Sequence, residues 1–220
     1  MPVSKTDFVR GLQCEKMLWL DAHLPQLKII PPEVQQRLDA GNAFGDNAMG
    51  IFGDFVETTA YRQDGRLDFA KMLQTTKTLI ENGERVICEG AFSWYGNFCA
   101  ADILKKEGDG YALYEVKNAP TPREEFLVDL GFQRLIIRKC GVKITRCYLV
   151  LSGEEIPLDD ASYKIVEVTS EAREKERLVE QRIFELGKIK KKDALQPQIP
   201  TGEHCEKPYR CWYFEHCHQP

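Results

Sequence analysis

The sequence lacks several features that would assign it to a specialised class of protein. None of its apolar runs approaches the length of a membrane span, and the opening MPVSKTDF contains no apolar core of a signal peptide, so we expect a cytoplasmic protein with no membrane contact. Internal repeats and low-complexity tracts are also missing. The net charge of −4 argues against broad electrostatic adhesion to nucleic acid. Contact with a phosphate backbone would need a metal ion or a local basic patch, such as Lys188, Lys190, Lys191 and Lys192.

The composition that remains is that of an ordinary globular protein. The 220 residues are 43% hydrophobic and 29% charged, and they can form one sizeable core or a core with a small appended subdomain. From the distribution of helix and strand patterns we predict three regions. These are a helical region over 1–84, a mixed α/β core over 85–170, and a C-terminal helix with a cysteine tail over 171–220.

The centre of the chain, residues 85–119, predicts an antiparallel meander. Three runs rich in aliphatic and aromatic residues are separated by the turn sequences YGN and GDG, which have the length of hairpin turns. Glu115 and Lys117 lie two apart on the third strand and so share a face, while Val116 faces the other side. Pairing around GDG brings Asp102 beside Glu115, at a spacing that suits two oxygen ligands of Mg²⁺ or Mn²⁺. The same triplet on a solvated polar strand edge is the commoner alternative.

Helix patterns surround the meander. The spacing of apolar residues predicts a helix over about 4–20, opened by a capping-box-like Ser4 and Asp7 and carrying Cys14 in its middle. Further helices are predicted from Pro32, over about 68–82, over 123–139 and over 171–192, with a parallel strand over 146–152. On the helix at 123–139, Gln133 lies on an otherwise apolar stripe that should face the sheet, where it would be a satisfied core residue or reach the site.

The cysteines fall into two groups. Four of the eight lie inside apolar patterns and are expected to be small buried hydrophobes: Cys88, Cys99, Cys140 and Cys147. Cys205, Cys211 and Cys217 stand in a short Pro- and aromatic-rich tail that is too small to be held together by burial alone. With Cys14 as a fourth ligand they suit a [4Fe–4S] cluster or a structural zinc. Nearby histidines leave a Cys₃His zinc site open: His204, His216 and His218.

The order of these motifs resembles a known family. ADIL with Asp102, YEVK with Glu115 and Lys117, and the following helical Gln133 are similar to motifs of the PD-(D/E)XK nuclease superfamily. The cysteines, together with SKTDFVRGLQC and KMLWL, resemble the RecB-like iron–sulfur branch, which includes CRISPR-associated exonucleases of the Cas-four type, the AddB nuclease domain and stand-alone relatives.

The resemblance implies a restriction-endonuclease-like core and assigns a role to each matching residue. Asp102 and Glu115 would bind the metal with the carbonyl of Val116, Lys117 would be the catalytic lysine, and Gln133 would position lysine and substrate. Cys14, Cys205, Cys211 and Cys217 would hold a structural [4Fe–4S] cluster. The chain departs from the family pattern at Gly45, where a metal-binding histidine is expected, and Glu89 or Asp46 are the candidate replacements.

These observations predict a metal-dependent deoxyribonuclease, in particular an exonuclease on single-stranded DNA ends. A nuclease-fold adaptor that binds DNA or a protein partner without cutting is the alternative, because of Gly45 and the acidic net charge. A zinc-stapled interaction protein is the third hypothesis.

Overall fold

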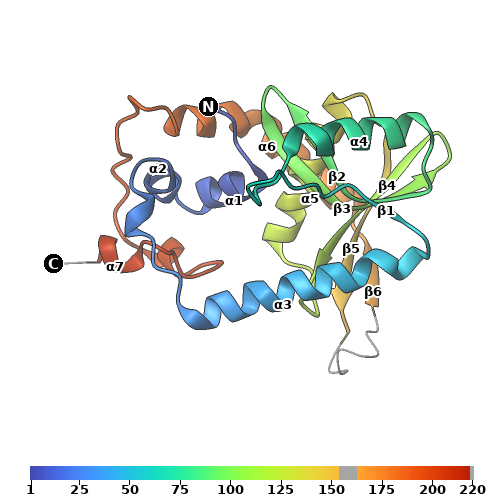
Figure 1. Ribbon diagram of the computed structural model, residues 1–220. Helices are drawn as coiled ribbons and strands as arrows, with labels where there is room; N and C mark the ends of the chain where they lie inside the picture. The colour runs from blue at the N-terminus through green and yellow to red at the C-terminus, as the bar shows by residue number, and fades with distance from the viewer. Residues whose placement is uncertain (154–162, 219–220) are drawn as a thin grey trace.

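The computed structural model describes residues 1–153 and 163–218, which form a mixed α/β structure around a six-stranded sheet (Figure 1). The strands lie in chain order across the sheet: β1 (Val56–Glu57), β2 (Val86–Trp94), β3 (Asn97–Glu107), β4 (Gly110–Lys117), β5 (Ile144–Ser152) and β6 (Tyr163–Glu167). The helices are α1 (Lys5–Gln13), α2 (Glu15–His23), α3 (Pro32–Ala48), α4 (Phe69–Glu81), α5 (Glu124–Lys139), α6 (Thr169–Ile189) and α7 (Phe214–Cys217). Short 3₁₀ helices are η1 (Pro25–Leu27), η2 (Met49–Phe52) and η4 (Glu203–Cys205).

The predicted meander is confirmed. Strands β2, β3 and β4 pair antiparallel, and β5 returns parallel to β4 after the α5 crossover, as expected for a connection that contains a helix. The sequence did not predict the two outer strands: β1 pairs parallel with β2, and β6 pairs antiparallel with β5. Strand β1 lies within the region 1–84 that the sequence predicts as helical.

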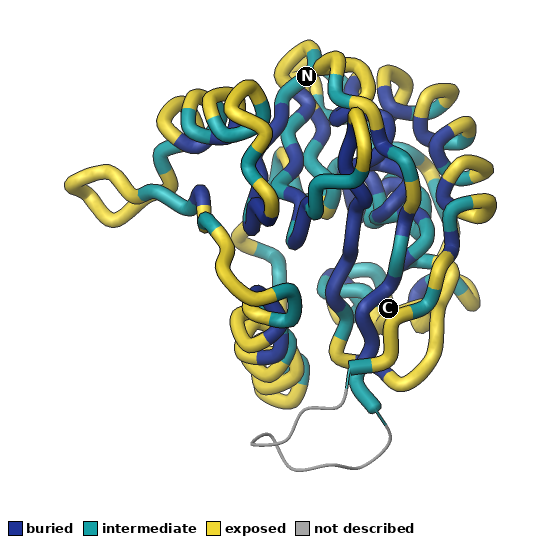
Figure 2. The backbone as a smooth tube through the Cα atoms, turned by 90° about the vertical axis from the view of Figure 1, so that its right-hand side faces the viewer, coloured by how far each residue is buried: buried dark blue, intermediate teal, exposed yellow. Residues whose placement is uncertain are grey.

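Helices cover both faces of the sheet. The larger cluster of buried side chains joins one face to α1, α5 and α6, and contains Leu113 of β4 with Leu130 and Phe132 of α5. A smaller cluster joins the other face to α3 and η2, where Phe44 packs with Cys88 and Val116. Figure 2 shows the buried segments running through the strands and the inner sides of these helices. The alternation of side chains along β4 thus points Glu115 towards α5 and Val116 towards α3.

The structure corrects the prediction for the N-terminal helix. The capping box of Ser4 and Asp7 is confirmed, but the helix ends at Gln13, and a second one starts at Glu15. Cys14 between them is extended, with φ −161 and ψ 115, so it lies at a junction and not in the middle of a helix. Its N–H donates to the Arg10 carbonyl, and its own carbonyl accepts from Leu18 N–H, so it caps both helices.

The other predicted helices are present. Pro32 lies in the first turn of α3, Asp68 caps α4, and Gly83 and Gly141 follow α4 and α5 with φ of 70 and 87, the left-handed conformation that favours glycine after a helix. Cys88, Cys99 and Cys147 are buried as predicted, but Cys140 is exposed because it follows the last turn of α5. In the described ranges, no helix combines the length and the apolarity needed to cross a membrane.

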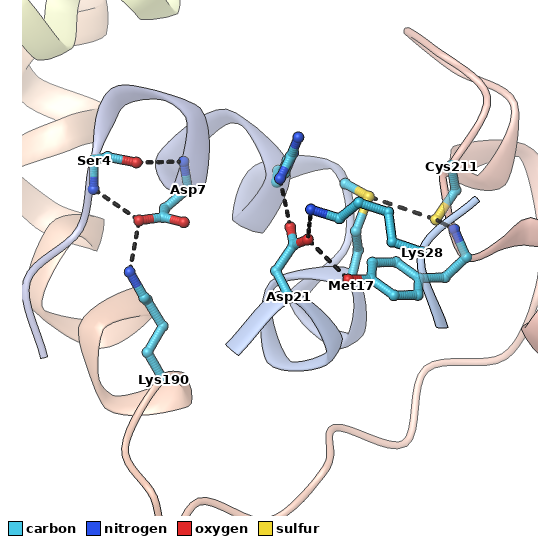
Figure 3. A network of polar contacts seen from close by, with 9 residues as sticks. Ser4, Asp7, Met17, Asp21, Lys28, Lys190 and Cys211 are labelled. Carbon is cyan, nitrogen blue, oxygen red and sulfur yellow. Dashed lines mark hydrogen bonds and ion pairs between the residues drawn. The ribbon is translucent and has the colours of Figure 1, made fainter. Parts of the chain in front are cut away.

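The N-terminal helices and the C-terminal tail lie side by side. Figure 1 shows α1 and α2 next to the tail that leads to α7. Gln13 Nε2 donates to the carbonyls of His204 and Tyr209 at 2.8 and 2.7 Å, and Tyr213 Oη donates to Asp21 at 2.9 Å. Figure 3 shows Asp21 of α2 together with Met17 and Cys211. The tail therefore packs on the N-terminal helices.

Candidate active site

Three carboxylates stand in one row across the centre of the sheet. Cys88 pairs with Ile103 and Gly90 with Ala101, so the register places Glu89 across from Asp102. Ile103 pairs with Tyr114, so the same register places Asp102 across from Glu115. Side chains in such a row share a face and have closely spaced Cβ atoms. The arrangement predicted for Asp102 and Glu115 is therefore present.

Glu115 is the most enclosed member of the row. Its side chain is fully buried, and Lys117 Nζ lies 2.7 Å from its Oε1. Gln133, also fully buried on α5, donates from Nε2 to Glu115 Oε2. The helix face that sequence periodicity assigned to Gln133 thus points at the sheet, and the structure brings Glu115, Lys117 and Gln133 together.

Asp102 interrupts the backbone ladder between β3 and β4. The paired residues of these strands end at Ile103 and Tyr114, and beyond that point the Val116 N–H donates to Asp102 Oδ2 at 2.7 Å. A side-chain oxygen therefore takes a backbone donor that a strand partner would otherwise satisfy. This bond fixes the Asp102 carboxylate beside the backbone of Val116, the residue whose carbonyl the family resemblance assigns to the metal.

Sequence reasoning missed two charged residues of the site. Lys5, the first residue of α1, has its Nζ 3.0 Å from Glu115 Oε1 and 4.0 Å from Asp102 Oδ1. Asp129 on α5 accepts from Lys117 Nζ at 2.6 Å. Asp129 could have been found, because it lies four residues before Gln133 and so shares its helix face. For Lys5 the signal is weaker: a cation at the start of a helix opposes the helix dipole and needs a nearby anion.

The charges of the site shift its pKa values in opposite directions. Burial favours the protonated form of Glu115, but the charges of Lys117 and Lys5 outweigh it and hold the pKa of this carboxyl below its usual range. Burial also opposes the charge of Lys117, yet Glu115 and Asp129 raise its pKa well above the usual value. Burial and then the charge of Glu115 raise the pKa of Asp102. At neutral pH Lys117 is therefore a cation and not a proton acceptor.

Glu89 completes the row from a strained position. Its φ of 55 lies in the left-handed region, which is unfavourable for a residue with a side chain, and the preceding carbonyl and its own carbonyl accept from Thr58. Burial and then the charge of Asp102 raise the pKa of Glu89 to about 8. Among residues 1–153 and 163–218, no three His, Cys, Asp or Glu side chains are grouped as a metal-binding set. Glu89 therefore lies in the same row as Asp102 and Glu115 without forming a three-carboxylate group with them.

The region expected to supply a histidine lies on α3. Its Phe44 packs against the sheet face of Val116, opposite to the face of Glu115. Gly45 has open space where a Cβ would stand, so no close packing requires a glycine there. Asp46 is exposed. His23, the last residue of α2, stacks on Trp19 and contacts the Trp19 and Lys191 carbonyls.

The four cysteines predicted as cluster ligands line one small cavity between α2 and the tail: Cys14, Cys205, Cys211 and Cys217. All four are free thiols. Burial raises the pKa of Cys14, and it raises the pKa of Cys211 to about 11, so these thiols need a bound cation to become thiolates at neutral pH. His204 also lines the cavity, and its Nε2 lies 3.7 Å from Cys205 Sγ.

The donor set of the acidic site fits a divalent cation. Asp102 and Glu115 offer carboxylate oxygens on one face, which is the ligand type that Mg²⁺ and Mn²⁺ prefer. Gln133 Oε1 is buried and finds no hydrogen-bond partner within the described part of the chain. A buried acceptor of this kind usually bonds to a water or a ligand. Two carboxylates, a charged lysine and an amide thus form an arrangement that can bind a cation and an anionic oxygen together.

Comparisons with known proteins add little to this geometry. No family model matches the chain, and no curated protein matches it. Among solved structures, the chain is similar to a proposed exonuclease from Eubacterium rectale, with 11% identity and a TM-score of 0.35, over 59% of this chain and 57% of that one. It is also similar to SSO0001, with 14% identity and a TM-score of 0.38, over 83% of this chain and 75% of that one. The chain thus spans little more than half of the first relative, and both likenesses are too distant to carry an argument about function.

Proposed function

We propose that the protein is a metal-dependent deoxyribonuclease that hydrolyses phosphodiester bonds, acting as an exonuclease on single-stranded ends. The observation that carries this proposal is the convergence of Asp102, Glu115 and Lys117 on one face of the sheet, with Gln133 bonded to Glu115. Lys117 and Asp102 each keep 23% of their side-chain surface exposed, so the ends of these side chains can meet a ligand from solvent.

Each residue has a defined part in this proposal. Asp102 and Glu115 would hold Mg²⁺ or Mn²⁺, with the Val116 carbonyl as a further oxygen ligand. The chemistry that such a cation supplies is polarisation of a phosphoryl oxygen and a lower pKa for the attacking water. Lys117 offsets negative charge on the phosphate as the transition state forms, since Glu115 and Asp129 keep its amine protonated. Gln133 holds Glu115 in one orientation.

Cleavage of labelled single-stranded DNA tests the proposal. The full chain is purified without oxygen and incubated with Mn²⁺ and oligonucleotides labelled at either end, which gives the polarity of cutting. Asp102→Asn and Lys117→Met should lower the rate at least about a hundredfold, as expected for loss of an electrostatic group. Asp109→Asn is the matched control, because this exposed carboxylate pairs with Lys143 at the turn between β3 and β4. Unchanged cleavage by both site variants would remove the assignment.

A second function is favoured by Gly45, which stands where a histidine ligand is expected. A nuclease-fold adaptor would bind DNA or a protein partner without cutting. The same assay distinguishes the two functions, because the adaptor gives a shift in gel mobility and no shortened product at any Mn²⁺ concentration.

We also propose that Cys14, Cys205, Cys211 and Cys217 hold a structural [4Fe–4S] cluster. The four thiols line one cavity, and four thiolates are the ligand set of a [4Fe–4S] cluster. Elemental analysis tests it: a brown protein should contain iron and acid-labile sulfide in equal amounts. A colourless protein with one equivalent of zinc would support a structural zinc site instead, held by four cysteines or by three cysteines and a histidine.

A further inference from the structure

Lys5 occupies an unusual position in the acidic site. Its ammonium contacts Glu115 Oε1 at 3.0 Å and lies 4.0 Å from Asp102 Oδ1, and these are the two carboxylates that the proposed function assigns to the metal. A divalent cation that binds both carboxylates must therefore share or take over the oxygen atoms that Lys5 neutralises. Two positive charges cannot occupy one pair of carboxylates without strong repulsion.

The backbone of Lys5 is held firmly, while its side chain reaches the solvent. Ser4 forms a bridge to Phe98 at the start of β3, and Val3 N–H donates to Asn97 Oδ1 at 2.8 Å. Asp7, one turn into α1, is bonded to Lys190 at 2.6 Å, and Figure 3 shows this contact beside the capping box. The Lys5 side chain is 25% exposed, so its amine can leave Glu115 for solvent without displacing α1.

Lys117 differs from Lys5 in this respect. Its amine also contacts Glu115, at 2.7 Å, but a second carboxylate, Asp129, binds it at 2.6 Å. Asp129 lies on α5, outside the set of carboxylates that would hold the metal, and it keeps Lys117 in place when Glu115 is engaged elsewhere. Of the two amines, Lys5 is the one whose contacts are both with proposed metal ligands.

We propose that Lys5 is an exchangeable internal cation, which a divalent metal ion displaces from Asp102 and Glu115. This inference rests on the proposed function, since it takes the metal site from there. Lys5 balances the charge of the two carboxylates and so sets the metal concentration at which the site becomes occupied. Removal of its charge should therefore tighten metal binding, whereas removal of an ordinary ligand or support residue would weaken it.

Binding of Mn²⁺ to the full chain, followed by the electron paramagnetic resonance signal of free Mn²⁺, tests this without any measurement of cleavage. Lys5→Met, which keeps the length of the side chain, should bind Mn²⁺ about tenfold more tightly than the wild type, as expected for removal of a nearby like charge. Lys5→Arg keeps the charge and should stay close to the wild-type affinity. Lys143→Met removes a surface lysine that pairs with Asp109, and it should leave the Mn²⁺ affinity unchanged.

Two further measurements tie the effect to this site. Addition of Asp102→Asn to Lys5→Met should abolish the tight binding. In thermal melts, Lys5→Met should be less stable than wild type in chelator, because Asp102 and Glu115 then lack one counter-charge. Saturating Mn²⁺ should raise its melting temperature more than that of wild type, because a ligand that binds the folded state stabilises it according to its affinity.

The outcomes separate this inference from the proposed function. Equal or weaker Mn²⁺ binding by folded Lys5→Met, with cleavage intact in the wild type, would overturn the role of Lys5 and leave the nuclease in place. Tighter binding by Lys5→Met in a protein that never cleaves DNA would support Lys5 and remove the nuclease. Absence of Mn²⁺ binding in all variants would overturn both.

Discussion

The acidic site and the cysteine tail differ in what holds their functional side chains in place. Glu115 and Gln133 come from the middle of the fold, on a strand paired on both sides and a helix packed over it. The tail contains only short elements, and the buried cluster that joins it to α2 consists of Met17, Leu20 and Tyr213. The first set of residues is positioned by regular structure, and the second by a few contacts.

The two regions also differ in charge balance. In the acidic site, Lys5 and Lys117 pair with Glu115, and Asp129 pairs with Lys117, so amines neutralise the carboxylates. In the tail, four thiols line one cavity. The buried cluster beside it is too small to stabilise the segment by itself. The comparison teaches that the acidic site is organised by the chain itself, whereas the tail has few contacts of its own and would depend on the proposed cluster. Four predictions test this difference, from the largest expected effect to the smallest.

Substitution of a tail cysteine should have the largest effect. Cys211→Ser should lose the proposed cluster and with it several kilocalories per mole of stability in the tail, since binding of such a group is coupled to folding. Limited proteolysis should then cut within 196–218, and metal analysis should show the loss. Cys140→Ser is the control, because this exposed cysteine lies far from the tail in sequence and follows α5. A Cys211→Ser protein whose tail resists proteolysis as well as that of the control would contradict the dependence of the tail on the proposed cluster.

Removal of the buried carboxylate should destabilise the core in the absence of any metal. Glu115→Ala leaves two amines without one of their partners, and loss of one member of a buried pair costs about 3 to 5 kcal/mol. Urea denaturation in chelator measures this, with Asp109→Ala as the exposed control. A loss of unfolding free energy no larger than that of the control would show that the site is not held in place by its own charge pairs.

Gln13 joins α1 to the tail, and its substitution should cost less stability than the two changes above. Gln13→Ala removes two hydrogen bonds to tail carbonyls, at 2.8 and 2.7 Å, and each such bond contributes about 1 kcal/mol. Proteolysis of the tail should become faster in the cofactor-loaded protein. Gln198→Ala, which removes a bond within the linker at 3.1 Å, should have a smaller effect. Equal rates for both variants would show that the tail does not depend on α1.

The smallest effect is expected at the capping box. Asp7→Asn should cost about 1 kcal/mol at neutral pH, as loss of a carboxylate in the first turn of a helix does. Burial raises the pKa of Asp7, but hydrogen bonds from Lys190 and Ser4 outweigh it and lower the pKa below its usual 3.8. A depressed carboxyl pKa stabilises the folded state above the unfolded pKa and loses this contribution as pH falls through the folded value. Wild type and variant should thus converge in acid, as measured by urea denaturation over a pH series.

Local patterns in the sequence predicted the part of the fold that local physics determines. The meander, the crossover helix and the Ser4 capping box follow from turn residues, side-chain alternation and spacing, and the structure confirms them. The juxtaposition of Asp102, Glu115 and Lys117 could be predicted for the same reason, because it depends on hairpin register alone.

The remaining features depend on contacts between distant segments. Strand β1 has two residues and exists through its pairing with β2, so its own sequence carries almost no strand signal. Lys5 meets Glu115 across 110 residues of sequence, which no periodicity can reveal. The apolar spacing continues through Cys14, and the break there becomes visible only when the residue is seen to cap α1 and α2 together.

Helix α1 has a consequence for insertions and deletions in the chain. Lys5, at the acidic site, is the first of its nine residues, and Cys14, at the tail, directly follows the last. An α-helix turns by about 100° for each residue, so a single alanine inserted between them would rotate one end against the other by more than a quarter turn. Either the amine would leave its carboxylates or the thiol would leave its cavity. The number of residues in this segment is therefore constrained more tightly than the identity of the side chains that face away from both ends.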